Sequence, residues 1–220
     1  MSARELLRRA KPTKSLLANQ PILRIGAVIL AAALAVTGLF GGLSEARGGH
    51  LPVVALGAVD RGEPWDVTID RVILVADFGT AVPLAHEGDH WFAVAATVKV
   101  TAEEPFLIAP GNASFPGIVS VSGVPGVAGP YADAAYLTSD ATNTPTLNPG
   151  VPDQVVFLWE RGPAAPVPDM VTVTIYGETY RVDSLSGSSQ WMDATPRAEV
   201  RTSVVDRRAE TQQSASPTDG

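Results

Sequence analysis

One motif in the sequence has the residue types and spacing of a zinc site: His86-Glu87-Gly88-Asp89-His90. On an α-helix, histidines four residues apart share a face and bind zinc, and the glutamate between them acts as general base. The neighbouring residues oppose a helix, because Gly88 and Asp89 are poor helix formers and His90 leads directly into the strongest strand pattern of the chain. We therefore interpret the motif as a hairpin loop. A zinc hydrolase is the least favoured function, and the sequence predicts no metal ligands.

Other patterns that could support catalysis or cofactor binding are incomplete. The glycine-rich segment 123–129 lacks the lysine and the helix of a phosphate-binding loop, and no G-x-S-x-G sequence marks a nucleophilic serine. The chain has no cysteine, which excludes disulfides, cysteine nucleophiles and thiolate metal sites. We expect a protein that is not an enzyme and uses no cofactor. A net charge of -7 also opposes nucleic-acid binding.

Two tryptophans keep a ligand-binding function open. Trp91 precedes Phe92 on a predicted strand, so one of these two side chains faces away from the main core. Trp191 lies among serines and is expected to be exposed, whereas Trp159 is expected in the core. A ligand- or glycan-binding domain that uses Trp91 and Trp191 is therefore the alternative to a protein-interaction module.

The segments that would position these residues are predicted to be β-strands. Alternating apolar residues favour strands, and the prolines and glycines between the runs favour turns. In the first run the alternation slips at Arg71, which indicates a bulge or a strand buried on both faces. The predicted strands are 65–76, 90–101, 118–121, 154–160, 170–176 and 179–183, with a tight turn at Gly177-Glu178 and an edge strand or short helix over 196–206.

The N-terminal region predicts a membrane anchor. Residues 25–44 contain no charged side chain and, as a helix rising about 1.5 Å per residue, are long enough to span the hydrocarbon core of a bilayer. Residues 1–43 carry six basic side chains and one acid, whereas residues 44–220 carry ten basic and 22 acidic side chains. Basic flanks stay in the cytoplasm, so we expect the N-terminus inside the cell membrane and the acidic domain outside. A signal peptide cleaved after Ala46 is the alternative.

Small residues recur on one face of the predicted anchor. In lipid, such residues let two helices pack closely. We expect this face to contact a membrane protein of an envelope or transporter complex. Its residues are Ala27, Ala31, Ala35, Gly38 and Gly42.

Three motifs of the β-rich region resemble those of a family of exported bacterial domains. They are Gly62-Glu63-Pro64-Trp65-Asp66-Val67, Glu87-Gly88-Asp89-His90-Trp91-Phe92-Ala93-Val94, and the turn Leu147-Asn148-Pro149-Gly150 before Val155-Val156-Phe157. Over roughly residues 57–185, the chain resembles the uncharacterised extracellular domains of Gram-positive and actinobacterial proteins related to mycobacterial immunoprotective secreted antigens. The resemblance implies an immunoglobulin-like β-sandwich that is exposed at the envelope and not catalytic. It implies no site residues.

Together these features predict an all-β protein, with an immunoglobulin-like β-sandwich behind a single N-terminal transmembrane helix. The expected function is a non-catalytic interaction or accessory module of a cell-envelope or transporter complex. The predicted organisation is a basic cytoplasmic segment 1–24, a transmembrane helix 25–44, a linker 45–56, a sandwich 57–190, a C-terminal extension 191–206 and a disordered tail 207–220.

Overall fold

The computed structural model describes residues 50–112, 116–182 and 187–209, and strands account for nearly all of their regular structure. The elements in chain order are β1 (Val59–Asp60), β2 (Trp65–Val75), the 3₁₀-helix η1 (Gly79–Ala81), β3 (His90–Val100), β4 (Phe106–Leu107), β5 (Val119–Ser122), β6 (Ala134–Leu137), β7 (Thr146–Leu147), β8 (Pro152–Arg161), β9 (Met170–Val182), β10 (Ser189–Ser203) and β11 (Val205–Asp206).

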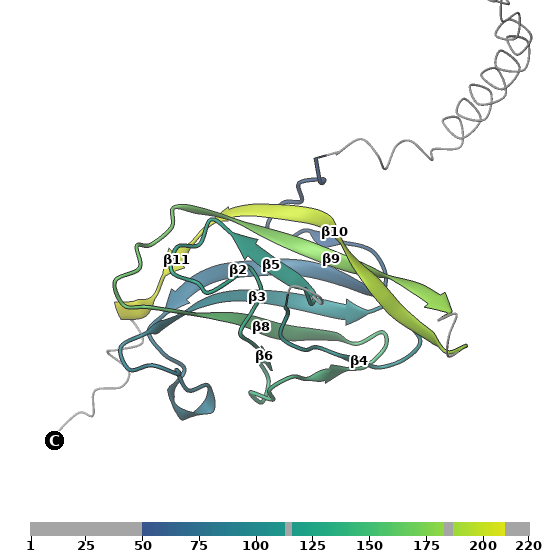
Figure 1. Ribbon diagram of the computed structural model, residues 1–220, viewed down its shortest axis with the longest axis horizontal. Coiled ribbons are helices and arrows are strands. Elements are labelled where there is room, and N and C mark those ends of the chain that lie inside the picture. The colour runs from purple at the N-terminus through teal and green to yellow at the C-terminus, as the bar shows by residue number, and fades with distance from the viewer. Residues whose placement is uncertain (1–49, 113–115, 183–186, 210–220) are drawn as a thin grey trace, which may run out of the picture. The chain divides into compact units, whose positions relative to one another are not determined.

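These strands form two sheets that pack face to face, together with one short separate pair. The larger sheet has the order β1-β2-β3-β8-β6, and β11 runs parallel to β2 at its edge. The smaller sheet has the order β10-β9-β5, and β4 pairs with β7. Figure 1 shows β5, β9 and β10 lying over the strands of the larger sheet. The predicted β-sandwich is therefore confirmed.

The inner faces of the two sheets form one hydrophobic core. Alternate residues of each strand point inward, which is the period of two that the sequence displayed. Phe92 of β3 and Trp159 of β8 meet edge to face, with 5.8 Å between ring centroids. Further strand residues in the same core are Trp65, Val67, Ile69, Val72, Leu74, Val94, Ala96, Val98, Val100, Val119, Val121, Val155, Phe157, Val171, Val173, Ile175, Ala198 and Val200.

The slip in the apolar pattern of β2 is a β-bulge. The pairing of β2 with β3 shifts between Ile69 and Arg71, so Asp70 is an extra residue on one strand. Odd-numbered residues of β2 face the core before the bulge. After it the even-numbered residues Val72 and Leu74 do so. The bulge thus keeps both halves of a long strand buried.

The outer face of the larger sheet carries a second, smaller hydrophobic cluster. The segment between β2 and β3 folds over this face and places Val82 and Leu84 against Trp91 and Leu158. This explains why the sequence of β3 is apolar on both faces, with Trp91 only 4% exposed. The packing also holds the segment that carries His86 against β8.

A buried arginine closes one end of the sandwich. Arg161, at the end of β8, is fully buried, and its guanidinium donates hydrogen bonds to the carbonyl oxygens of Pro125 at 2.8 Å and Pro166 at 2.7 Å. Its cross-strand partner is His90 at the start of β3. Burial lowers the pKa of His90, and the positive charge of Arg161 lowers it further. His90 is therefore a buried structural histidine at this end.

The predicted turn at Gly177-Glu178 is wrong, because β9 runs through both residues and pairs with β10 as far as Val182. Gly177 has a different role. A Cβ at this position would lie 2.9 Å from the carbonyl oxygen of Glu63, so the glycine permits a close approach between the two sheets.

The C-terminal extension predicted over residues 191–206 is also corrected. Most of it is β10, whose Ala198 and Val200 lie in the core. Of the two alternatives left open for 196–206, the strand is observed. β10 is an edge strand, and Pro196 lies at an irregularity of its pairing with β9. Proline is tolerated there because an edge strand does not need every N–H group for pairing.

The predicted transmembrane helix 25–44, with its face of small residues, lies outside the described residues, as does the tail 210–220. Within the part of the chain that the structure describes, no helix is long and apolar enough to cross a membrane.

Candidate functional site

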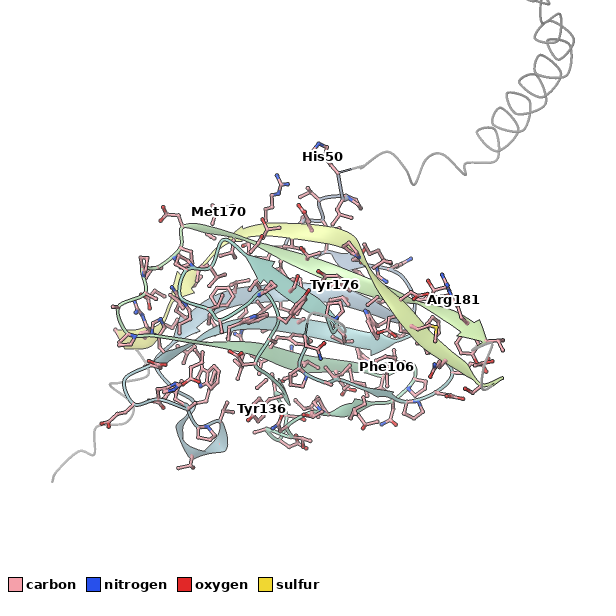
Figure 2. The ribbon with its side chains drawn as sticks, in the orientation of Figure 1. His50, Phe106, Tyr136, Met170, Tyr176 and Arg181 are labelled. Atoms are coloured by element: carbon pink, nitrogen blue, oxygen red, sulfur yellow. The ribbon has the colours of Figure 1, made fainter. Side chains whose placement is uncertain are left out.

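At the end of the sandwich opposite Arg161, β9 and β10 continue beyond the third strand of their sheet. We call residues 179–182 and 189–192 the β9–β10 arm. β5 pairs with β9 only as far as Ile175, and the residues of the arm are exposed or half-exposed. Figure 2 shows Arg181 on this arm and Met170 at the opposite end of β9.

The arm forms part of a pocket of about 340 Å³. Tyr180 and Trp191 are cross-strand partners on the arm, and their rings lie 5.2 Å apart between centroids at an angle of 55°. The remaining lining residues come from the turn before β2 and from the segment after β3: Glu63, Thr101, Ala102, Glu103 and Glu104. The pocket, which we call the arm pocket, therefore combines two aromatic rings with three carboxylates, and no basic side chain of the described residues lines it.

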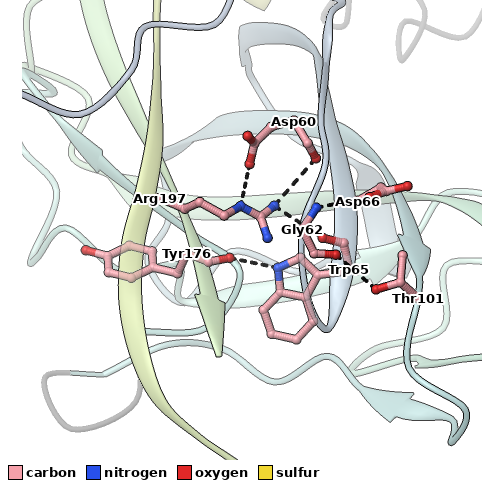
Figure 3. A network of polar contacts seen from close by, with 7 residues as sticks. All are labelled: Asp60, Gly62, Trp65, Asp66, Thr101, Tyr176 and Arg197. Carbon is pink, nitrogen blue, oxygen red and sulfur yellow. Dashed lines mark hydrogen bonds and ion pairs between the residues drawn. The ribbon is translucent and has the colours of Figure 1, made fainter. Parts of the chain in front are cut away.

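A network of polar contacts holds the two sheets together beside this pocket (Figure 3). The indole nitrogen of Trp65 in β2 donates to the carbonyl oxygen of Tyr176 in β9 at 2.8 Å. Arg197 of β10 donates from Nε to Asp60 Oδ2 at 2.6 Å and from Nη2 to the carbonyl oxygen of Trp65 at 3.2 Å. Phe106 packs edge-on against Trp65 at 4.6 Å between centroids. These contacts hold β9 and β10 to the larger sheet just before the residues of the arm begin.

The turn before β2 is shaped to fit this network. Gly62 donates its N–H to Asp66 Oδ1 at 3.1 Å and accepts a hydrogen bond from the Thr101 hydroxyl at 3.0 Å. A Cβ at Gly62 would collide with the guanidinium of Arg197. Glycine at this position thus lets the Arg197 side chain cross the turn. The next residue in the chain, Glu63, lines the arm pocket.

One carboxylic acid beside the pocket is buried. Glu178 is 6% exposed, and its backbone N–H donates to the carbonyl oxygen of Glu63 at 3.2 Å. Within the described residues, neither of its carboxyl oxygens has a hydrogen-bond partner. Burial raises the pKa of Glu178 from 4.5 to about 7. A carboxyl group in such surroundings keeps its proton to a higher pH than an exposed one, because the charged form is poorly solvated there.

The two histidines of the zinc-like motif lie on opposite faces of the larger sheet. His90 is buried at the inner end beside Arg161, whereas His86 is exposed and its backbone N–H donates to Glu160 Oε1 at 2.9 Å. His86 lies in a bend and Glu87-Gly88 form a turn, with Gly88 at a φ of 86°. The helix that would bring both imidazoles to one zinc ion is therefore absent from this segment.

The two tryptophans that were predicted to bind a ligand, Trp91 and Trp191, lie in different parts of the fold. Trp91 is buried in the outer cluster and is not available to a ligand, which removes it from the glycan-binding hypothesis. Trp191 is half-exposed and lines the arm pocket, and Trp159 lies in the core as predicted. Sequence alone did not identify Tyr180 or Glu63. Tyr180 could have been recognised as the partner of Trp191 if β9 had been extended through Gly177, whereas no sequence signal places Glu63 beside them.

Comparison with known proteins identifies no family. No family matches the sequence, and no curated protein matches it. Among solved structures, an uncharacterised β-sandwich protein from Clostridium difficile 630 aligns with 71% of this chain and 97% of its own, at 11% sequence identity and a TM-score of 0.41. The strand order described above therefore defines the class: the described part of the chain is a β-sandwich.

Loss of the Arg197 contacts should destabilise the fold. We expect Arg197→Met to lower the free energy of unfolding by about 2–3 kcal/mol, because it leaves the largely buried Asp60 carboxylate without its charged donor. Arg201→Met, on the same strand, is the control. Arg201 pairs with Glu199 at the surface and should contribute less than about 1 kcal/mol. Urea denaturation measures both, and equal losses would contradict a special role for Arg197.

Titration of Glu178 should make the protein less stable as the pH rises. Its pKa is about 7 in the folded protein and 4.5 in the absence of burial, so between these values the folded state holds a proton that the unfolded state releases. The free energy of unfolding therefore falls from about pH 4.5 to about pH 7. Glu178→Gln should remove this part of the slope and be more stable than the parent at pH 8, but not at pH 4. Exposed Glu104→Gln is the control, and an unchanged slope in Glu178→Gln would refute the assignment.

Proposed function

We propose that this protein is a non-catalytic binding module that recognises a cationic segment of another protein through the arm pocket. The single observation that carries the proposal is the composition of that pocket, in which Tyr180 and Trp191 lie with three glutamates. A lysine or arginine side chain gains from both groups: its charge is attracted to aromatic faces and to carboxylates.

The charges of the pocket select against other ligands. An anionic ligand would be repelled by Glu63, Glu103 and Glu104. A neutral sugar could stack on Trp191, but it would not use three negative charges. A basic peptide can contact both the aromatic rings and the carboxylates of the lining, and it can extend along the β9–β10 arm. A glycan-binding domain is the second candidate, because a sugar would use the aromatic rings alone.

A binding function agrees with the chemistry available at this pocket. Among the described residues, Thr101 is the only hydroxyl nucleophile of the lining besides tyrosine, and its hydroxyl donates to the carbonyl oxygen of Gly62. No histidine from the described part of the chain lines the pocket to act as its base. These contacts favour recognition of a partner over nucleophilic catalysis.

We place this module outside the cell membrane, tethered by the apolar segment 25–44 with the N-terminus in the cytoplasm. The proposal rests on the length of that segment and on the change from a basic to an acidic composition across it. The resemblance of three motifs to those of the secreted-antigen family of immunoglobulin-like domains favours the same location. We further propose that the small residues of segment 25–44 contact a membrane protein of an envelope or transporter complex.

A basic peptide should bind the full chain through the arm pocket. We expect hexalysine, used as a fluorescent probe in detergent solution, to bind with an affinity that falls as salt is added, because the attraction is electrostatic. Trp191→Ala should weaken binding about tenfold, which corresponds to the loss of one cation–π contact of about 1.4 kcal/mol. Glu103→Gln with Glu104→Gln should weaken it by at least as much. Fluorescence anisotropy measures each affinity.

Two control variants test whether hexalysine binds at the arm pocket or is attracted to the acidic protein in general. Phe78→Ala removes another exposed aromatic ring, and Glu87→Gln removes a carboxylate at the opposite end of β3. Both should bind hexalysine like the parent. Equal binding by Trp191→Ala and the parent would refute the proposal. Binding to a glycan array that requires Trp191 and not the two glutamates would favour the second candidate.

Protease treatment of spheroplasts tests the proposed orientation. A full-length chain with different epitope tags at its two ends should lose the C-terminal tag to external proteinase K and keep the N-terminal tag, since the membrane protects the basic segment. A soluble cytoplasmic protein serves as the control for intact spheroplasts. Protection of the C-terminal tag until lysis would contradict the orientation, and release of a shortened chain into the medium would indicate a cleaved signal peptide.

A further inference from the structure

A mixed set of metal-ligand side chains lies at the Arg161 end of β3, away from the arm pocket. The set consists of His86 and Asp89 from the segment before β3 and Glu160 from β8. One atom from each, the His86 Nδ1 and a carboxylate oxygen of Asp89 and of Glu160, lies within 4.8 Å of the other two. Two segments that are more than seventy residues apart in the chain therefore converge on one point.

The distances between these atoms are closer to those between two ligands of one metal ion than to those of a direct hydrogen bond. His86 Nδ1 lies 3.6 Å from Asp89 Oδ2 and 3.6 Å from Glu160 Oε1, which is longer than an ordinary hydrogen bond. In a tetrahedral zinc site, with ligands about 2.0–2.2 Å from the metal, two ligand atoms are about 3.4 Å apart. The two separations from the imidazole are close to that value, and the two carboxylate oxygens lie within 4.8 Å of each other.

The fold holds the three groups in place without an ion. The backbone N–H of His86 donates to Glu160 Oε1 at 2.9 Å, and the N–H of Asp89 donates to the carbonyl oxygen of His86 at 3.3 Å. Val82 and Leu84 anchor the same segment to the outer cluster. The carboxylates of Asp89 and Glu160 are mostly buried, with side-chain exposures of 14% and 16%, while the His86 imidazole is accessible.

A further carboxylate concentrates negative charge at this point. Asp133 accepts the backbone N–H of Glu160 at 2.8 Å and lines the same shallow groove of about 360 Å³ as His86, Asp89 and Glu160. A divalent cation in this groove would offset the repulsion among the carboxylates of Asp89, Asp133 and Glu160.

We propose that His86, Asp89 and Glu160 bind one divalent transition-metal ion, with Zn²⁺ as the best fit to one imidazole and two carboxylates and with water in the remaining position. The site is independent of the proposed partner binding, and it differs from the zinc-like sequence motif. Glu160 is a ligand in place of His90, which is buried on the other face of the sheet. The bound ion would fix the segment between β2 and β3 to β8.

Calorimetric titration of the metal-free full chain with ZnCl₂ tests the proposal. We expect one strong site per chain, weakened at least tenfold by His86→Ala and by Glu160→Gln. The His86 side chain is exposed, so its removal should leave the fold intact, and glutamine keeps an oxygen for the N–H of His86. Zinc should also raise the melting temperature of the parent and of neither variant. X-ray absorption at the zinc edge should detect a single imidazole among oxygen ligands.

Two control variants test whether zinc binding depends specifically on the three proposed ligands. Glu87→Gln changes the glutamate of the sequence motif that does not belong to the cluster, and His50→Ala changes a histidine remote in sequence from the motif. Both should keep the zinc affinity of the parent. The proposal is overturned if the parent binds no zinc, if His86→Ala and Glu160→Gln bind like the parent, or if Glu87→Gln loses as much affinity as they do.

Discussion

The contact of Trp65 with the opposite sheet is the interaction on which the rest of this structure depends. Two sheets that meet only through apolar side chains could slide over one another, but a buried indole N–H must find an acceptor. The acceptor is the carbonyl oxygen of Tyr176, and Arg197 adds hydrogen bonds from the same sheet to Asp60 and to Trp65 itself. These directional contacts determine where β9 and β10 leave the sandwich and so where the arm pocket forms.

The two candidate sites lie at opposite ends of one strand. β3 begins at His90, next to the ligand cluster of His86, and ends at Val100, next to the acidic segment that lines the arm pocket. A strand of this length spans about 35 Å, so the two sites can act separately. Each site combines a segment that flanks β3 with residues from other strands: Glu160 of β8 at one end, and Tyr180 of β9 and Trp191 of β10 at the other. The strand β3 sets the distance between the two sites, and the segments that flank it carry side chains that could bind a ligand.

The residues of the zinc-like motif illustrate how far local sequence could predict function. Its poor helix formers and the strand pattern after it correctly indicated that the two histidines do not share a helical face. The alternation of a strand then explains why His90 is buried while His86, just before the strand, remains outside. Sequence could not identify Glu160 as a neighbour of His86, because that contact depends on the pairing of β3 with β8. Metal ligands were therefore not expected from the sequence.

By itself, the sequence determined the period-two strands, the slip of their alternation at Arg71, and the contrast between a basic N-terminal region and an acidic remainder, because each is a property of neighbouring residues. Only the tertiary structure decided that β9 continues through Gly177, that β10 belongs to the sandwich, and that Glu103 lies beside Trp191. The reason is physical. A glycine permits a turn or a close approach equally well, and which of the two occurs depends on what the rest of the chain places against it.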